Sequence, residues 1–136
     1  MERYDKALKT YADALMVEDI VFTGQISFPA ILAYYRIADV FLCMSEHEGF
    51  CVPLVEAMYF DTPIIAYDSS AIADTLGGSG ILINDKDPVF VAMVIDRLMK
   101  DEALRGHVLE KQRQRLEYFS YENMKNRLIE GIKRFI

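Results

Sequence analysis

Hydrophobic residues follow two kinds of pattern along this chain. Short runs without polar alternation cover Asp39–Met44, Thr62–Tyr67 and Gly80–Asn84. Strands that are buried on both faces have this composition, and both faces are covered mainly in parallel α/β sheets. Another short apolar run, Asp19–Gly24, ends on a glycine and is predicted to be a strand as well.

Elsewhere apolar residues recur at spacings of three and four, which predicts amphipathic helices. We expect helices over residues 2–16, from Ser27 onward, from 53 to about 60, over 71–76, from Asp87 onward, over 101–118 and from Ser120 onward. Methionines and tyrosines at helical spacing, such as Tyr11 and Met124, are expected in the core. The order of strands and helices predicts one α/β domain over residues 1–136, a three-layer, Rossmann-like parallel sheet flanked by helices.

Composition narrows the class of protein. The chain has 136 residues, 52% of them hydrophobic, which excludes a disordered polypeptide. A net charge of −6 argues against nucleic acid as a partner, because such binders need an excess of Lys and Arg. Cys43 and Cys51 are too few for a disulfide framework and are read as reduced thiols in the cytoplasm. No uncharged run reaches the ~20 apolar residues of a transmembrane segment.

The segment that follows the strand at 39–44 carries the candidate chemistry. Ligands of parallel α/β sheets bind outside the carboxyl ends of the strands, where Glu48 and Gly49 lie. Glu56 stands near the start of the next helix, and its side chain leans back toward the loop. Free N–H groups at that helix start favour a phosphate, whereas carboxylates accept hydrogen bonds from sugar hydroxyls. The pattern indicates a ligand with both groups; the alternative is two solvated glutamates.

The segment E-G-F-C-V-P-L-V-E-A-M, which contains Glu48 and Glu56, resembles the E-x7-E motif of retaining glycosyltransferases of the GT-B fold, family 4. The stretches 21–24 with 26–27, 33–35 with 38–42, 62–68 and 79–83 are similar to those that flank the motif in that family. Cys51 stands where the family commonly has a second glycine. The resemblance implies a GT-B donor-binding domain that binds a nucleoside diphosphate sugar and transfers the sugar to a hydroxyl acceptor with retention. It implies no cofactor and no essential metal.

The resemblance also implies residue roles. Glu56 would hold the ribose hydroxyls, and Glu48, the candidate catalytic residue, would contact the transferred sugar. The sugar and the diphosphate would meet the loop and helix start at Gly49, Phe50, Cys51 and Val52. The nucleobase would be bordered by the backbone of Gly24, Gln25 and Ile26.

Several parts of the family pattern have no counterpart in this sequence. The family's domain begins with two more strand–helix units, whose early loop supplies an Arg and a Lys for the diphosphate. We therefore expect an incomplete domain that lacks its N-terminal acceptor-binding partner, binds the donor weakly and transfers nothing alone. Between Arg36 and Lys86 the chain has no Lys or Arg, so backbone donors and the helix dipole alone would face the diphosphate. The missing strands would leave strand 39–44 with a bare edge. Either the strand near residues 20–23 closes this gap or another chain fills it, and we expect a second copy of the chain.

Two other functions and one surface stay open at this point. The chain could be a noncatalytic nucleotide-sugar-binding module, or a GT-B glycosyl phosphorylase. The second is disfavoured because no lysine for pyridoxal phosphate lies between Arg36 and Lys86. The basic run Lys111–Arg115 is read as the solvated face of a helix, with an anionic membrane surface as the alternative. The expected location is cytoplasmic, at most peripheral at a membrane.

Overall fold

The computed structural model describes residues 2–135, and the chain divides into two compact units, residues 1–31 and 32–136. The first unit contains helix α1 (Glu2–Ala14) and the start of helix α2 (Phe28–Ile37). Within this unit the Lys9 amine lies 5.8 Å from the centroid of the Phe22 ring.

The strand predicted over Asp19–Gly24 is wrong. No helix or strand is assigned between the end of α1 and the start of α2. A strand needs a neighbour for its N–H and C=O groups, and among residues 2–135 no strand pairs with this run. Val21, at the centre of the run, is 76% exposed, so these apolar residues are not buried in a sheet.

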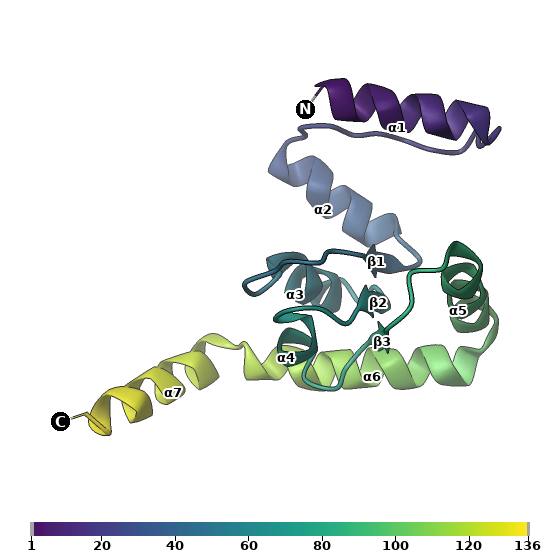
Figure 1. Ribbon diagram of the computed structural model, residues 1–136. Coiled ribbons are helices and arrows are strands. Elements are labelled where there is room, and N and C mark those ends of the chain that lie inside the picture. Colours follow the sequence, from purple (N-terminus) through teal and green to yellow (C-terminus); the bar gives the residue numbers. More distant parts are fainter. Residues whose placement is uncertain (1, 136) are drawn as a thin grey trace. The chain divides into compact units, whose positions relative to one another are not determined.

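The second unit is built on a parallel sheet with the strand order β1-β2-β3 (Figure 1). The strands are β1 (Phe41–Cys43), β2 (Ile64–Tyr67) and β3 (Ile81–Ile83). Ile65 of the central strand pairs with Leu42 on one side and with Ile81 on the other. The predicted parallel sheet is therefore confirmed, with strands shorter than the apolar runs. Within the described part of the chain β1 is an edge strand, and its cover by a second copy stays a prediction.

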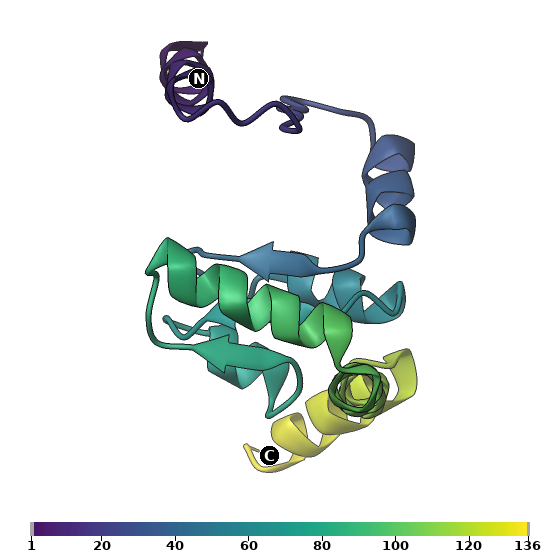
Figure 2. The same cartoon turned by 90° about the vertical axis from the view of Figure 1, so that its right-hand side faces the viewer.

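Helices lie on both sides of this sheet, which confirms the expected α/β architecture. They are α3 (Val52–Tyr59), α4 (Ile72–Leu76), α5 (Pro88–Lys100), α6 (Glu102–Tyr118) and α7 (Tyr121–Lys133). In Figure 1, α3 and α5 lie on opposite sides of the strands. Figure 2 shows α5 in front of the strands, with α6 seen along its axis.

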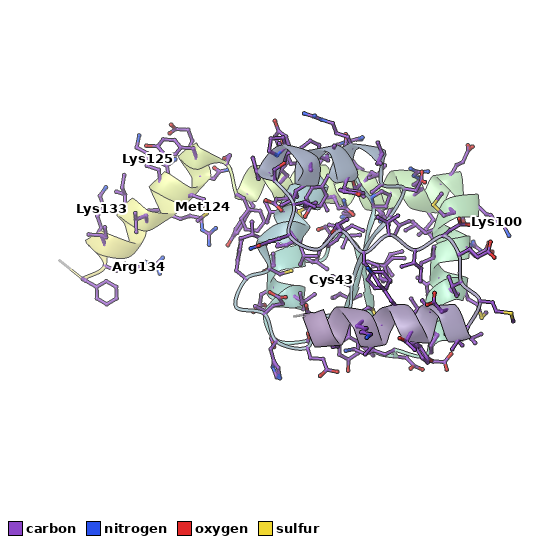
Figure 3. The ribbon with its side chains drawn as sticks, turned by 90° about the horizontal axis from the view of Figure 1, so that it is seen from above. Cys43, Lys100, Met124, Lys125, Lys133 and Arg134 are labelled. Carbon is purple, nitrogen blue, oxygen red and sulfur yellow. The ribbon has the colours of Figure 1, made fainter. Side chains whose placement is uncertain are left out.

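Helix α7 extends away from the sheet of its unit (Figures 1 and 3). Its apolar side is uncovered, with Tyr121 77% and Met124 47% exposed, and Tyr11 of α1 is 64% exposed. The expectation that tyrosines and methionines at helical spacing lie in the core is wrong at these positions. Helical periodicity identifies an apolar face, but it carries no information about whether another element covers it.

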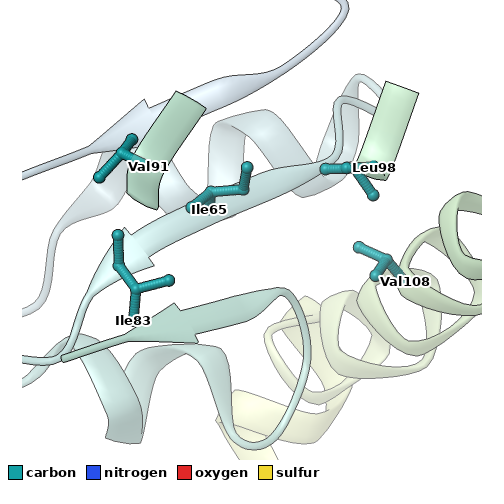
Figure 4. Close-up of a cluster of buried hydrophobic side chains, with 5 residues drawn as sticks. All are labelled: Ile65, Ile83, Val91, Leu98 and Val108. Atoms are coloured by element: carbon teal, nitrogen blue, oxygen red, sulfur yellow. The ribbon is translucent and has the colours of Figure 1, made fainter. Parts of the chain in front are cut away.

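One buried hydrophobic cluster lies between the sheet and the pair α5 and α6. It contains Ile65, Ile83, Val91, Leu98 and Val108 (Figure 4). Two aspartates set the limits of these helices: the Asp87 side chain accepts hydrogen bonds at the start of α5, and the Asp101 side chain does so at the start of α6.

The basic run Lys111–Arg115 is not a uniformly solvated face. Gln112 is completely buried in α6 and bonds to the backbone that leads into β2. Its Oε1 accepts from the N–H of Ile64 at 2.9 Å, and its Nε2 donates to the carbonyl of Thr62 at 2.9 Å. Thr62 lies just before β2 and Ile64 is its first residue, so Gln112 supplies partners to backbone groups that the neighbouring strands do not bond.

Candidate functional site

The loop between β1 and α3, residues 44–51 and here called the motif loop, is held by its carbonyl oxygens. Five of them accept hydrogen bonds from residues that follow β2 and β3. The donor–acceptor pairs are Lys86 Nζ to Met44 (2.9 Å), Ser69 Oγ to Ser45 (2.6 Å), Ser70 Oγ to Glu46 (3.0 Å), Ala71 N–H to Glu48 (3.4 Å) and Thr75 Oγ1 to Phe50 (2.5 Å). The loop is thereby fixed at the carboxyl ends of the strands, where ligands of parallel sheets bind.

The amide groups of the same loop are left unpaired. Within residues 2–135, no acceptor meets the N–H groups of Gly49, Phe50, Cys51 or Val52. Helix α3 begins at this point without a side-chain cap, and Phe50 and Val52 are 45% and 55% exposed. Unpaired N–H groups at an open helix start favour an anion, because the helix dipole adds a partial positive charge.

Cys51, the residue before α3, has a left-handed backbone with φ 63° and ψ 68°. This conformation explains why a glycine suits the position, since a Cβ is disfavoured there. Its thiol is buried 3.9 Å from the thiol of Cys43. Burial, then Cys43 and Glu48, raise the pKa of Cys51 to about 12, so its thiol stays neutral and adds no negative charge to the anion site at neutral pH.

The Glu56 side chain is oriented by Tyr35 of α2, within the same unit. The Tyr35 hydroxyl donates to Glu56 Oε2 at 3.0 Å and lies 3.3 Å from the carbonyl oxygen of Pro53. The Tyr35 ring is buried and stacks on Phe60 with a centroid distance of 5.7 Å. Burial and the neighbouring Glu56 carboxylate raise the pKa of Tyr35, so the hydroxyl remains a donor. Glu56 Oε1 has no hydrogen bond to another described residue.

Glu48 and Glu56 both border the start of α3. Glu48 is half-buried in the motif loop and lies close enough to Cys51 to raise the pKa of its thiol. Glu56 is bonded to Tyr35, whose pKa is in turn raised in part by Cys51. Glu48 thus precedes the start of α3 in the motif loop, and Glu56 follows it in the second turn of that helix.

Two residues of this region were missed by sequence reasoning. Tyr35 lies within the helix expected from Ser27 onward, and the one signal in the sequence that it needs a partner is a hydroxyl at a position suited to burial. Lys86 was counted as lying beyond the motif, yet its amine lies 2.8 Å from Glu46 Oε1 and 4.3 Å from the centroid of the Tyr67 ring. The hydrogen bond from Lys86 lowers the pKa of Glu46, so this carboxylate stays ionised and the lysine compensates its negative charge.

The remaining predicted site residues, Gly24, Gln25 and Ile26, belong to the first unit. Gly24 has a positive φ of 57°, which fits a turn. Their role at the nucleobase stays a prediction. Across residues 2–135, no three His, Cys, Asp or Glu side chains are grouped as they would be to hold a metal ion.

Relatives of known class match this chain over most of its length. It is 26% identical over 140 residues to a serotype-specific mannosyltransferase WbdA of Escherichia coli, which covers 100% of this chain and 16% of the relative. It is 30% identical over 104 residues to a D-inositol 3-phosphate glycosyltransferase of Corynebacterium urealyticum, covering 74% of this chain and 24% of the relative. The chain thus spans less than a third of the length of either relative.

Solved structures show the same fold. The C-terminal domain of the glycosyl transferase group 1 family protein LpcC from Francisella tularensis superimposes with a TM-score of 0.69 and 27% identity, covering 85% of this chain and 61% of that one. A sucrose-phosphate synthase from Thermosynechococcus elongatus shares the fold with a TM-score of 0.75 over 96% of this chain and 34% of that one. None of the described helices is long and apolar enough to span a membrane. The family model of the glycosyl transferases group 1 matches residues 2–122, and the chain belongs to this family.

Proposed function

We propose that this chain binds the nucleoside diphosphate sugar for a glycosyltransferase. The observation that carries the proposal is the motif loop, of which five carbonyls are held by residues that follow β2 and β3 while the amides of residues 49–52 stay unpaired. Unpaired amides suit a diphosphate, and carboxylates suit the hydroxyls of a ribose or hexose. The relatives named above are themselves transferases, which favours transfer over phosphorolysis or binding alone.

Each carboxylate has a separate role in this proposal. Glu56, oriented by Tyr35, accepts hydrogen bonds from the ribose hydroxyls through its unpaired oxygen. Glu48, at the opposite end of the motif, contacts the transferred sugar. As the bond between sugar and phosphate breaks, negative charge grows on the leaving diphosphate, and the amides of Phe50, Cys51 and Val52 stabilise it without reorganising. Retention of configuration follows from the family resemblance.

The charge around the site limits what the chain can do alone. Lys86 is already paired with Glu46, so it compensates an acid instead of offering a free cation to the diphosphate. A helix dipole contributes only ~0.3–1 kcal/mol near a surface. We therefore propose weak donor binding and no transfer by this chain without an acceptor-binding domain. Two free cysteines among the described residues fit a cytoplasmic location.

Calorimetric titration of UDP, GDP and their sugars into the chain tests the proposal. Glu56→Ala should weaken nucleotide binding roughly tenfold or more, because a charge-assisted hydrogen bond contributes about 1.5–3 kcal/mol. Glu48→Ala should reduce only the extra affinity of the nucleotide sugar over the free nucleotide. Glu110→Ala, which removes an exposed carboxylate of α6, is the matched control. Equal affinities for Glu56→Ala and Glu110→Ala would contradict the ribose role.

A further inference from the structure

The carbonyl of Phe50 accepts a hydrogen bond from Thr75, and Thr75 is in turn bonded to Arg115 of α6. Thr75 is 3% exposed and donates its hydroxyl to that carbonyl. It lies in the last turn of α4, where carbonyl groups have no partner within the helix. Arg115 of α6 supplies the missing donors: its Nε bonds to the Thr75 carbonyl at 3.0 Å and its Nη2 to the Asp74 carbonyl at 2.6 Å.

Arg115 also reaches the motif loop through aromatic rings. Its guanidinium lies 4.1 Å from the centroid of the Tyr118 ring and 4.8 Å from that of Phe119. The Phe119 ring in turn meets the Phe50 ring edge to face, with a centroid distance of 5.5 Å and an interplanar angle of 87°. Both the backbone and the side chain of Phe50 therefore depend on partners that contact one guanidinium.

The space that this guanidinium occupies exists because residue 77 is a glycine. A Cβ at Gly77 would lie 2.5 Å from Arg115 Cζ and 2.6 Å from its Nε. Gly77 ends α4 with a positive φ of 56°, so the same residue closes the helix and admits the arginine. A lysine at position 115 would not replace this arrangement, since it has no planar fork to serve two carbonyls while stacking on rings.

We propose that Arg115 is the positioning residue of the motif loop. It holds Thr75 and Phe119 so that the amides of Phe50, Cys51 and Val52 keep the orientation in which they meet the diphosphate. Its contribution to donor binding rests on the proposed function. Its contribution to the order of the motif loop does not, because it follows from contacts within the chain.

The test compares Arg115→Gln with Arg113→Gln in the full chain. Arg113 lies on the same helix and pairs with the exposed Asp61 at 2.8 Å, so its loss removes the same charge without touching the network. The first readout, the heteronuclear NOE of the backbone amides, needs no ligand. The values for residues 50–52 should fall in Arg115→Gln and remain unchanged in Arg113→Gln. The values for β2 should change in neither variant.

The second readout is the dissociation constant for UDP and GDP. Arg115→Gln should weaken nucleotide binding roughly five- to tenfold, the loss expected for imperfectly placed hydrogen bonds. Thr75→Val and Gly77→Ala should reproduce the NOE change, the first by removing only the hydroxyl and the second by displacing the guanidinium with its charge intact.

The two readouts separate the two proposals. Unchanged NOE values at residues 50–52 in Arg115→Gln, or an equal change in Arg113→Gln, would overturn the positioning role. If Arg115→Gln does not fold, the NOE values of Thr75→Val decide in the same way. Absence of nucleotide binding by the unsubstituted chain would refute the proposed function, and the NOE values would still confirm or refute the role of Arg115 in ordering the loop.

Discussion

Replacing Tyr35 with phenylalanine isolates the hydroxyl that orients Glu56. The ring and its stacking on Phe60 are retained, so the substitution removes only the bond of 3.0 Å to Glu56 Oε2 and the contact of 3.3 Å with the Pro53 carbonyl. A hydrogen bond to a charged group contributes about 1.5–3 kcal/mol, but half-buried Glu56 can recover part of it from water. We expect the free energy of unfolding to fall by about 1–2 kcal/mol.

The neighbouring Tyr34 provides the control on the same helix. Its side chain is 44% exposed, and Tyr34→Phe should change the free energy of unfolding by less than about 0.5 kcal/mol. Urea denaturation followed by circular dichroism at pH 7 measures both variants. A double-mutant cycle of Tyr35→Phe with Glu56→Gln should give a coupling energy of about 1 kcal/mol. Equal effects of the two tyrosine variants, or a coupling near zero, would refute the claim that Tyr35 acts on Glu56.

Two further predictions concern stability. Gln112→Leu should lower the free energy of unfolding by about 2–4 kcal/mol in urea denaturation, because two buried backbone groups lose their partners, whereas Gln114→Leu on the exposed side of α6 should change it by less than about 0.5 kcal/mol. Similar values for the two glutamine variants would contradict this account. The folded-state pKa of Cys51 lies above its ordinary value of 9.0, so between pH 9 and 12 the unfolded thiol ionises and the folded one does not. The free energy of unfolding should therefore fall as pH rises from 9, by at most about 1.4 kcal/mol per pH unit. This decrease should be smaller in Cys51→Ala. An equal decrease in the two proteins would show that Cys51 does not titrate in this way.

The strands of the sheet and the helix limits could be predicted because their signals are local. Buried strands between two helix layers need continuous apolar runs, and β2 has one from Ile64 to Ala66 with every residue buried. Asp87 and Pro88 at the start of α5 satisfy that helix end within the segment itself. Such features depend on neighbours in the sequence, so their physical basis can be read from the residues alone.

Predictions failed where the decisive partner lies far away in the chain. The run 19–24 has strand composition but no neighbouring strand among the described residues. Gln112 looks like one more polar residue in a basic run, and only the position of the β2 backbone makes it a buried partner. The donors that hold the motif loop come from residues 23 to 42 positions later in the sequence. Three of them are serine or threonine hydroxyls, which could equally well face water.

The candidate site shows the same division. The pair Glu48 and Glu56 could be predicted as a site from spacing and resemblance, and their roles stay a prediction. The bond from Tyr35 and the support from Arg115 could not, because neither residue type is unusual at its position in a helix. Residues that orient a site carry less of a sequence signal than residues that touch a ligand.

The most direct test of the account is an NMR titration of the uniformly 15N-labelled chain with UDP and GDP. We predict saturable shifts of the backbone amides of Gly49, Phe50, Cys51 and Val52 with at least one nucleotide, and their loss in Glu56→Ala. Saturable shifts confined to other parts of the chain, or none at millimolar nucleotide, would contradict the claim that an open helix start beside two carboxylates receives the donor.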